Sequence, residues 1–159
     1  MEGLSIAANV LAVVGAADIA IRGTTSLINL VGAIKTAPKQ VESLRSEVRD
    51  LGNTIVRVRT FVSKFQSSPA SAQDSRSLED LELALKGCQG TLCRLRRSLE
   101  ELRVEPIGNL FGQLRWRTGY VLSDTKIRDM CQELERRKTT LIALLAITGK
   151  SDCLIFSPS

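Results

Sequence analysis

The chain contains no histidine, the residue that most often serves as a general base and as a metal ligand in proteins. A Ser-His-Asp triad, a Cys-His pair and His-ligated metals are therefore excluded. Four cysteines remain, but none of them forms a C-x-x-C pair, so a zinc site would need thiolates from scattered positions. We interpret Cys88, Cys93, Cys131 and Cys153 as small buried hydrophobes in a reducing compartment, and we expect no metal and no cofactor.

Aromatic residues and proline are also scarce, with aromatics at 4% and only four prolines. A β-sandwich usually needs more aromatic and β-branched strand runs than this composition provides. Apolar residues still make up 43% of the 159 residues, mostly as Leu, Val, Ile and Ala, which is enough for the core of one domain. The composition predicts an all-α fold packed through aliphatic side chains.

A strong charge of one sign is missing as well. The 22 Lys and Arg residues face 17 Asp and Glu residues, and the net charge of +5 is spread over both halves of the chain. Dedicated nucleic-acid binders concentrate basic residues on one face, so we do not expect nucleic acid as a partner. A diffuse surplus of this size permits weak attraction to an anionic membrane without requiring it.

The most apolar part of the chain, residues 6–21, has neither the flanks of a signal peptide nor an uninterrupted span. The residues before it include Glu2 and no base, which is wrong for a secretory signal. Asp18 and Arg22 interrupt the run before about 18 uncharged residues accumulate, so we expect it to be too short to cross a membrane. These two charges lie one helical turn apart, where they can pair with each other. We expect the protein to be cytoplasmic, and peripheral association with a membrane is compatible with that location.

This apolar run belongs to a first helical segment over residues 4–35. Its residues are apolar on most sides, so the helix must be buried in a bundle or in lipid. Gly23-Thr24-Thr25 weakens the helix, which leaves two short helices or one bent helix as alternatives.

Two heptad seams follow, each alternating steps of three and four residues, as is typical of helices that pack on other helices. The first seam consists of Val41, Leu44, Val48, Leu51, Ile55, Val58, Val62 and Phe65. The second seam consists of Leu78, Leu81, Leu85, Cys88, Leu92, Leu95, Leu99 and Leu102. Pro38 fits the first turn of the first of these helices. Between the seams, residues 66–77 have a loop composition, and Ser77 resembles a helix N-cap.

Gly87 and Gly90 lie inside the second seam helix, where they either let a neighbouring helix approach closely or mark a bend. Pro106 and Gly108 are expected to end that helix, with residues 107–120 as a connection.

A fourth helix is predicted over residues 123–148, with a less clean seam because Lys138 takes an expected apolar position. The predicted seam residues are Ile127, Cys131, Leu134, Leu141, Leu145 and Thr148. Gly149 is expected to end this helix as its C-cap. The chain is therefore predicted to form a bundle of about four long helices over residues 1–148, followed by a short tail over residues 149–159.

A search for catalytic chemistry finds only one fragment of interest. Gly149-Lys150-Ser151 resembles the end of a phosphate-binding P-loop, but the required earlier glycine is replaced by Leu144. The fragment also closes a helix, whereas a P-loop opens one. We expect no catalytic residues, no nucleotide site and no small-molecule substrate, and we expect the protein not to be an enzyme.

Two groups of residues are candidates for contact with a membrane or a partner. They are the apolar side chains of the first helix and the Arg-Trp-Arg cluster before the fourth helix. For the cluster, the alternative is that the tryptophan caps the core and the arginines are solvated. The candidates are Leu4, Ile6, Val10, Val14, Arg115, Trp116 and Arg117.

Several short motifs, in their order and spacing, resemble one known family. They are Gly3-Leu4-Ser5-Ile6-Ala7-Ala8, Ala37-Pro38-Lys39, Ser46-Glu47-Val48, Leu114-Arg115-Trp116 and Lys138-Thr139-Thr140-Leu141. Together they resemble the fungal N-terminal domain of STAND proteins, named after a protein of an azaphilone-pigment gene cluster, over residues 1–148. The resemblance implies a helical domain that precedes ankyrin repeats or NACHT NTPase modules. It also implies similarity to the HeLo-like domains of fungal cell-death effectors, and it carries no catalytic residues.

The sequence thus predicts a non-enzymatic helical protein-interaction or adaptor domain of the fungal STAND-receptor type. Through the resemblance, it is also expected to be an accessory protein of a fungal secondary-metabolite cluster. The expected partners are other proteins or a second copy of the chain. The alternative is a HeLo-like membrane-targeting effector that uses the apolar first helix. A stand-alone adaptor and a piece of a receptor both remain open, since the chain contains no NTPase or repeat module.

Overall fold

The structure is a computed structural model that describes residues 2–32, 39–64, 72–103 and 110–155, with side chains described for residues 6–32, 41–64, 75–100 and 125–149. Each of the four stretches is one α-helix: α1 Glu2–Gly32, α2 Lys39–Lys64, α3 Ala72–Arg103 and α4 Leu110–Ile155. The described residues contain no strand, which confirms the predicted all-α bundle.

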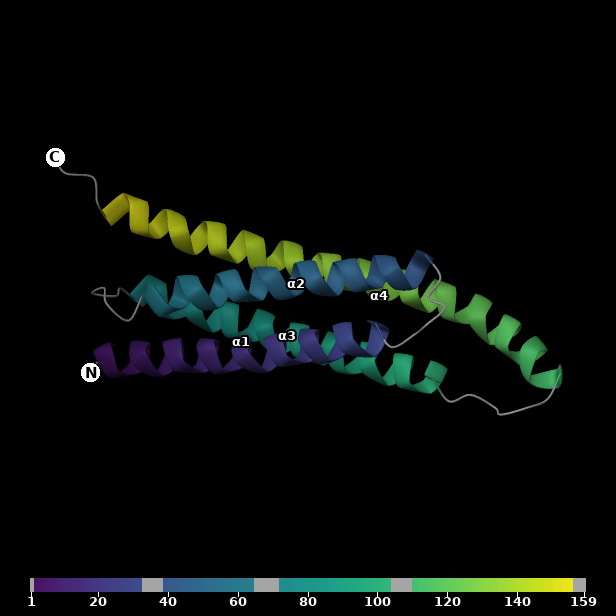
Figure 1. The fold of residues 1–159 in the computed structure, drawn as a ribbon. Coiled ribbons are helices and arrows are strands. Elements are labelled where there is room, and N and C mark those ends of the chain that lie inside the picture. Colours follow the sequence, from purple (N-terminus) through teal and green to yellow (C-terminus); the bar gives the residue numbers. More distant parts are fainter. Residues whose placement is uncertain (1, 33–38, 65–71, 104–109, 156–159) are drawn as a thin grey trace.

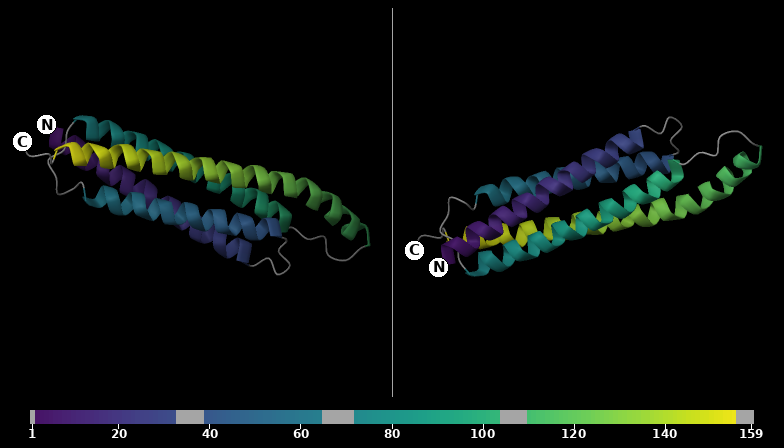
Figure 2. Two further views of the ribbon diagram at one scale, coloured as in Figure 1. Left: turned by 90° about the horizontal axis from the view of Figure 1, so that it is seen from above. Right: turned by 90° about the horizontal axis from the view of Figure 1, so that it is seen from below.

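The helices form an elongated bundle in which α1 and α4 each pack against both α2 and α3 (Figure 1). Helices α1 and α4 therefore face each other across one diagonal, and α2 and α3 across the other. The chain reverses direction from each helix to the next, so α1 is antiparallel to α2 and parallel to α3 (Figure 2). As a result, the start of α1 and the end of α4 lie at the same end of the bundle.

The core is built from the two predicted seams. Every described residue of both seams is buried, from Val41 to Val62 in α2 and from Leu78 to Leu99 in α3. Helix α1 contributes Val10, Val13 and other residues of one face to the same core. Side chains spaced at three and four residues share one face of a helix, so this outcome follows directly from the helical period. Pro38, Phe65, Pro106 and Gly108 lie outside the described residues, and the side chains of Leu102 and Cys153 lie outside the described side chains.

The seam of α4 contains the expected exception. Ile127, Leu134 and Leu141 of α4 are buried. Lys138 occupies the seam position between them and is only 21% exposed, with its Nζ 3.2 Å from Oε2 of Glu47 on α2. A half-buried ammonium needs such a partner because desolvation of an unpaired charge is costly. This ion pair thus allows a lysine to occupy one position of an otherwise apolar seam.

Helix α1 is a single helix, and the alternative of two short helices is wrong. Gly23 and Thr24 are packing residues, whereas Thr25 is exposed. A Cβ on Gly23 would lie 3.3 Å from Cδ1 of Leu92, so the missing side chain lets α3 approach closely. Thr24 is buried, and its hydroxyl donates to the carbonyl oxygen of Ile21 at 2.8 Å, which satisfies it within the helix.

Three predicted boundaries are also wrong. Helix α3 begins at Ala72, so Ser77 is a buried residue inside the helix and not its N-cap. Part of the reason is a tertiary contact: the side-chain amide of Asn9 in α1 donates to the hydroxyl of Ser75 at 2.9 Å. The polar composition of residues 66–77 predicts a loop, but residues 72–77 form the first turns of α3.

Helix α4 extends past both predicted ends. It begins at Leu110, within the expected connection, and continues to Ile155, so Gly149 does not end it. A Cβ on Gly149 would lie 3.9 Å from Cε2 of Phe61. The glycine therefore lies in a packed part of α4, where contact with α2 supports the helix despite its low helix propensity.

Candidate interaction surface

Helix α1 is apolar on its exposed side as well as on its buried side. Its exposed residues Ala8, Leu11, Gly15 and Ile19 recur at steps of three and four and so line one face, which we name the α1 outer face. Leu11 is 64% exposed and Ile19 is 59% exposed. Isolated exposed leucines are ordinary in proteins, but a run of uncharged exposed positions from Ala8 to Ile19 on one helix face is not. The next exposed position of the same stripe is Arg22, which ends the uncharged part of the face.

Gly15 lies at the centre of the α1 outer face, one turn from each of its two large side chains. A Cβ placed on it would meet nothing within 4 Å, so no other part of the described chain covers this point. The face is therefore a low region flanked by Leu11 and Ile19. That shape suits close approach by another helix.

An ion pair lies on each side of this face. On the α2 side, Arg59 Nε lies 2.8 Å from Oδ1 of Asp18. This corrects the expected pairing of Asp18 with Arg22, because the helix α2 brings a closer cation. On the α3 side, Lys86 Nζ lies 2.7 Å from Oε1 of Glu82. Each pair thus carries both signs of charge, and the exposed Arg22 adds a positive charge at the end of the face.

The predicted contact residues of α1 differ in how far they are buried. Val10 is 1% exposed and belongs to the core. Ile6 and Val14 are partly buried and pack against that core. The side chain of Leu4 lies outside the described ones, as do those of Arg115, Trp116 and Arg117, whose backbone belongs to α4.

The residues that form the α1 outer face, Leu11, Gly15 and Ile19, were not singled out in the sequence. The helical period contains the signal, since the core residues Val10, Val13, Ala17 and Ala20 leave these positions on the opposite side. Hydrophobicity alone does not separate the two faces, because both are apolar.

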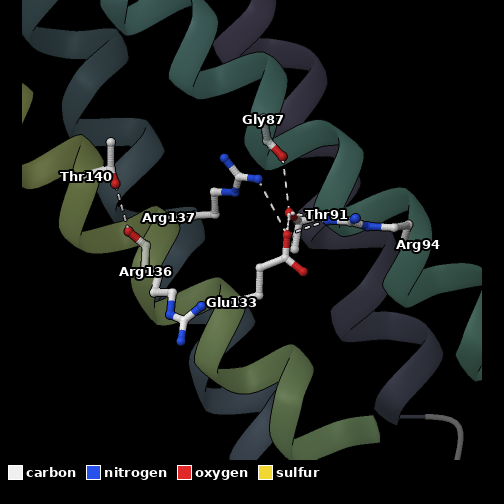
Figure 3. A network of polar contacts seen from close by, with 7 residues as sticks. All are labelled: Gly87, Thr91, Arg94, Glu133, Arg136, Arg137 and Thr140. Atoms are coloured by element: carbon white, nitrogen blue, oxygen red, sulfur yellow. Dashed lines mark hydrogen bonds and ion pairs between the residues drawn. The ribbon is translucent and has the colours of Figure 1, made fainter.

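A polar cluster joins α3 to α4 on another side of the bundle (Figure 3). Oε1 of Glu133 lies 2.9 Å from the hydroxyl of Thr91 and 3.5 Å from Nη2 of Arg137, and it also pairs with Arg94. Burial alone would raise the pKa of Glu133. The hydrogen bond from Thr91 and the charges of Arg94 and Arg137 outweigh burial, so the pKa lies below its ordinary value.

Gly87 makes room for this cluster. A Cβ on Gly87 would lie 2.6 Å from Nη1 of Arg137, so the guanidinium occupies the space that a side chain would fill. Of the two alternatives for Gly87, close approach is the one observed. A Cβ on Gly90 would meet nothing within 4 Å.

The surface beside this cluster is hollowed to a volume of about 550 Å³, lined by Asp129, Gln132, Glu133, Arg136, Arg137 and Thr140. All six lining residues belong to α4. Ligand sites usually draw convergent polar groups from several elements around an enclosed cavity, and this hollow follows one helix. The carboxylate of Glu133 is ionised and forms ion pairs with two arginines, so it carries no proton to donate as a general acid.

The cysteines only partly match the prediction of buried hydrophobes. Cys88 is buried, and burial raises its pKa to about 11, partly offset by the charge of Arg137. Cys131 is half-buried, and burial followed by the charge of Glu47 raises its pKa. Cys93 is exposed, so the prediction was wrong for that residue. Within the described part of the chain, no three His, Cys, Asp or Glu residues come together in a way that would hold a metal ion.

The expectation that the apolar run is too short to span a membrane is also wrong. Residues Ile6–Gly32 form 27 residues of helix with a mean hydropathy of 1.6, which is long and apolar enough to cross a bilayer. Asp18 and Arg22 lie within it, so the two charges reduce its hydropathy without ending the span. Length and composition of this kind are shared by core helices of soluble proteins, and part of α1 is indeed core.

The structure therefore defines a class: a helical bundle that exposes apolar side chains on one face of its first helix. The sequence assigns the family. Residues 1–153 match the family described as pigment biosynthesis cluster protein PigL N-terminal, and the chain belongs to that family. This confirms the resemblance to the domain named after a protein of a pigment cluster. No curated protein and no solved structure matches the chain.

Proposed function

We propose that this chain is a non-enzymatic interaction domain that binds other protein surfaces through the α1 outer face. The observation that carries the proposal is the exposure of Leu11 and Ile19 on a helix whose opposite side is core. Exposed apolar surface is costly in water, and contiguous apolar surface on a folded domain commonly marks an interaction site. The helix can serve both roles at once because its two faces are separate.

Membership of the family gives this proposal its context. A domain from a pigment-cluster protein family fits an adaptor of the fungal STAND-receptor type, or an accessory protein of a secondary-metabolite pathway. In either setting the domain acts in the cytoplasm by recruitment of a protein. The carboxylate of Glu133 is paired with two arginines, and the hollow along α4 is open to solvent. Both features favour protein recruitment over catalysis as the function of the domain.

Quantitative affinity capture tests the proposal in the cell that produces the protein. The tagged chain is compared with a variant that carries Leu11→Glu and Ile19→Glu, and with Leu83→Glu as a matched control. Leu83 is 71% exposed on α3, so the control adds a charge at an exposed leucine elsewhere. We expect the double variant to lose captured proteins that the control retains. The same captured set from all three chains would contradict the proposal.

Membrane binding is the second candidate, because the hydropathy and length of α1 also suit a bilayer. In that case α1 would leave the bundle, and the Asp18–Arg59 ion pair would break. An acid near the centre of a membrane helix costs about 2.5–3.5 kcal/mol on insertion scales, so this candidate requires stronger liposome binding by Asp18→Asn. Flotation with phosphatidylserine vesicles at low salt tests it. The interaction proposal expects the parent chain and Asp18→Asn to remain in the unbound fraction.

A further inference from the structure

We infer that a second surface of the bundle, formed by the last parts of α2 and α4, docks an acidic helix of a partner protein. This surface goes beyond the proposed function, because it lies on helices other than α1. Each helix contributes one stripe of exposed residues that recur at steps of three and four. The stripes, which together we name the basic end face, are Asn53, Arg57, Thr60 and Lys64 on α2 and Thr139, Ile142 and Ala146 on α4.

The two stripes lie side by side because α2 and α4 pack against each other and run in the same direction (Figure 1). Glu47 of α2 pairs with Lys138 of α4, which is 91 positions further along the chain. Phe61 lies 3.9 Å from a Cβ built on Gly149, which is 88 positions further along. Residues of α2 are therefore level with residues of α4 about 90 positions later, and the two stripes overlap in height.

Arg57 and Ile142 lie next to the contact between the two helices. Arg57 precedes Phe61 by one helical turn, and Phe61 faces α4. Ile142 follows Lys138 by one turn, and Lys138 faces α2. Both side chains are nevertheless exposed, and Ile142 retains 51% of its accessible surface. The basic end face thus presents a base beside a large apolar side chain.

The charge on this surface has one sign. Residues 51–64 of α2 contain Arg57, Arg59 and Lys64 but no Asp or Glu, and residues 139–149 of α4 contain no charged residue. Arg59 is already paired with an acid of α1. Among the described side chains, neither Arg57 nor Lys64 has an acid within ion-pair distance. Two exposed bases are therefore left without a counter-charge.

The nearest acids along α2 and α4 lie toward the middle of the bundle. Asp50 precedes Arg57 by seven residues, and Glu135 precedes Ile142 by seven residues. Seven residues of helix span about 10 Å at 1.5 Å per residue. This separation exceeds the Debye length of about 8 Å at physiological ionic strength, so these acids compensate the bases only weakly. A partner that gains from the uncompensated charge must be acidic.

The composition of the surface favours a protein helix over other acidic partners. Polybasic segments that bind anionic lipid use about four to eight Lys or Arg residues, and two bases are few by that measure. Nucleic-acid binding likewise depends on several phosphate contacts. An amphipathic helix presents an apolar side chain and acids at fixed positions, which matches Ile142 beside Arg57 and Lys64.

The size of the surface predicts weak, transient binding. From Asn53 to Lys64 the α2 stripe is about 17 Å long at 1.5 Å per residue. Interfaces below the standard size are typical of transient encounters, so we expect dissociation constants in the micromolar range or above. Because two exposed ion pairs contribute to the binding, its strength should fall as salt is added.

Fluorescence polarisation with synthetic peptides tests the inference. Three alanine-rich peptides of about 18 residues, long enough to form helix in isolation, carry leucines on one face. They differ only in the residues that flank the leucines, which are Glu, Lys or Gln. The parent chain is expected to bind the Glu peptide most tightly and the Lys peptide least. Binding of the Glu peptide should weaken as the ionic strength rises.

Charge-reversal variants localise this binding. Arg57→Glu with Lys64→Glu is expected to weaken binding of the Glu peptide by about tenfold or more, because two attractions become repulsions. The matched control is Arg76→Glu with Arg97→Glu, which changes the net charge equally at two exposed bases of α3. The control should weaken binding by less than about threefold, since its charges lie on another helix and are screened. Ile142→Gln should also weaken binding, without a change in charge.

Several results would overturn the inference: absence of binding, equal affinity for the Glu and Lys peptides, or equal losses in the two charge-reversal pairs. Flotation of the parent chain with phosphatidylserine vesicles, abolished by Arg57→Glu with Lys64→Glu, would assign the surface to lipid instead. None of these results decides the proposed function, which is tested separately by captured proteins and variants of α1.

Discussion

At the scale of single residues, the fold depends on fully buried aliphatic side chains at the centres of two helices. Leu51 of α2 and Leu95 of α3 are both 0% exposed. Their positions in uninterrupted seams were sufficient to predict this burial, since a residue in the middle of a heptad seam has apolar neighbours on both sides. The exposure of Cys93 was not predictable in the same way, because cysteine is compatible with either environment.

Replacement of either leucine should therefore be costly. Leu51→Ala or Leu95→Ala is expected to lower the free energy of unfolding by about 2–5 kcal/mol, through lost burial and the cavity left behind. Urea denaturation followed by circular dichroism gives this value. The exposed Leu83→Ala should change stability by less than about 0.5 kcal/mol. A parent-like midpoint for both buried variants would place these leucines outside the core.

Glu133 provides a residue-scale prediction that depends on pH. Because its pKa is lowered in the folded chain, the ionised carboxylate stabilises the fold at neutral pH. This contribution is present above the ordinary glutamate pKa of about 4.3 and is lost as the pH falls through the lower pKa of the folded state. Glu133→Gln should thus be less stable than the parent at pH 7, and the difference should shrink in acid. A difference that is constant from pH 7 to acid would contradict the assignment of the cluster.

At the scale of helices, periodicity predicted the packing faces well and composition predicted the ends poorly. Residues 72–77 are polar and were predicted as a loop, yet they form the start of α3, where the Asn9–Ser75 hydrogen bond supports them. Gly149 was predicted as a helix end, yet it packs near Phe61 inside α4. In both cases tertiary contact outweighs the local preference, and no single-sequence signal reports such a contact.

The Lys138–Glu47 ion pair tests how α2 and α4 hold their register. Truncation of one partner, as in Glu47→Ala, leaves a half-buried charge without its counter-ion and should destabilise the fold by about 1–3 kcal/mol. Replacement of both residues by leucine should restore the stability of the parent or exceed it, because apolar residues of similar size often replace buried ion pairs without loss. Urea denaturation of the parent, of Glu47→Ala and of the double leucine variant measures both effects. Equal losses in the single and the double variant would show that the pair does not act as a unit.

At the scale of the whole molecule, the arrangement of the bundle explains why one helix can be both core and surface. Among the four described helices, α1 packs against α2 and α3, and α4 lies across the diagonal. Its outward side therefore remains exposed, whatever its composition. The sequence predicted the buried role of α1 from its apolar character, but the same character concealed the α1 outer face, since Leu11 and Ile19 are as apolar as the core residues on the opposite side.

The rate of thiol labelling measured along α1 tests the central claim most directly. Cysteines are placed one at a time at Leu11, at Ile19 and at the core position Val13, in a background with Cys93, Cys131 and Cys153 replaced by serine, so that the native thiol left is the buried Cys88. In dilute folded protein, Leu11→Cys and Ile19→Cys should react almost as fast as in the unfolded chain. Val13→Cys should react only through unfolding. Equal rates at all three positions would show that α1 is not packed in the bundle as the structure places it. Protection of all three at every concentration would show that the α1 outer face is covered within the monomer, and would contradict the account.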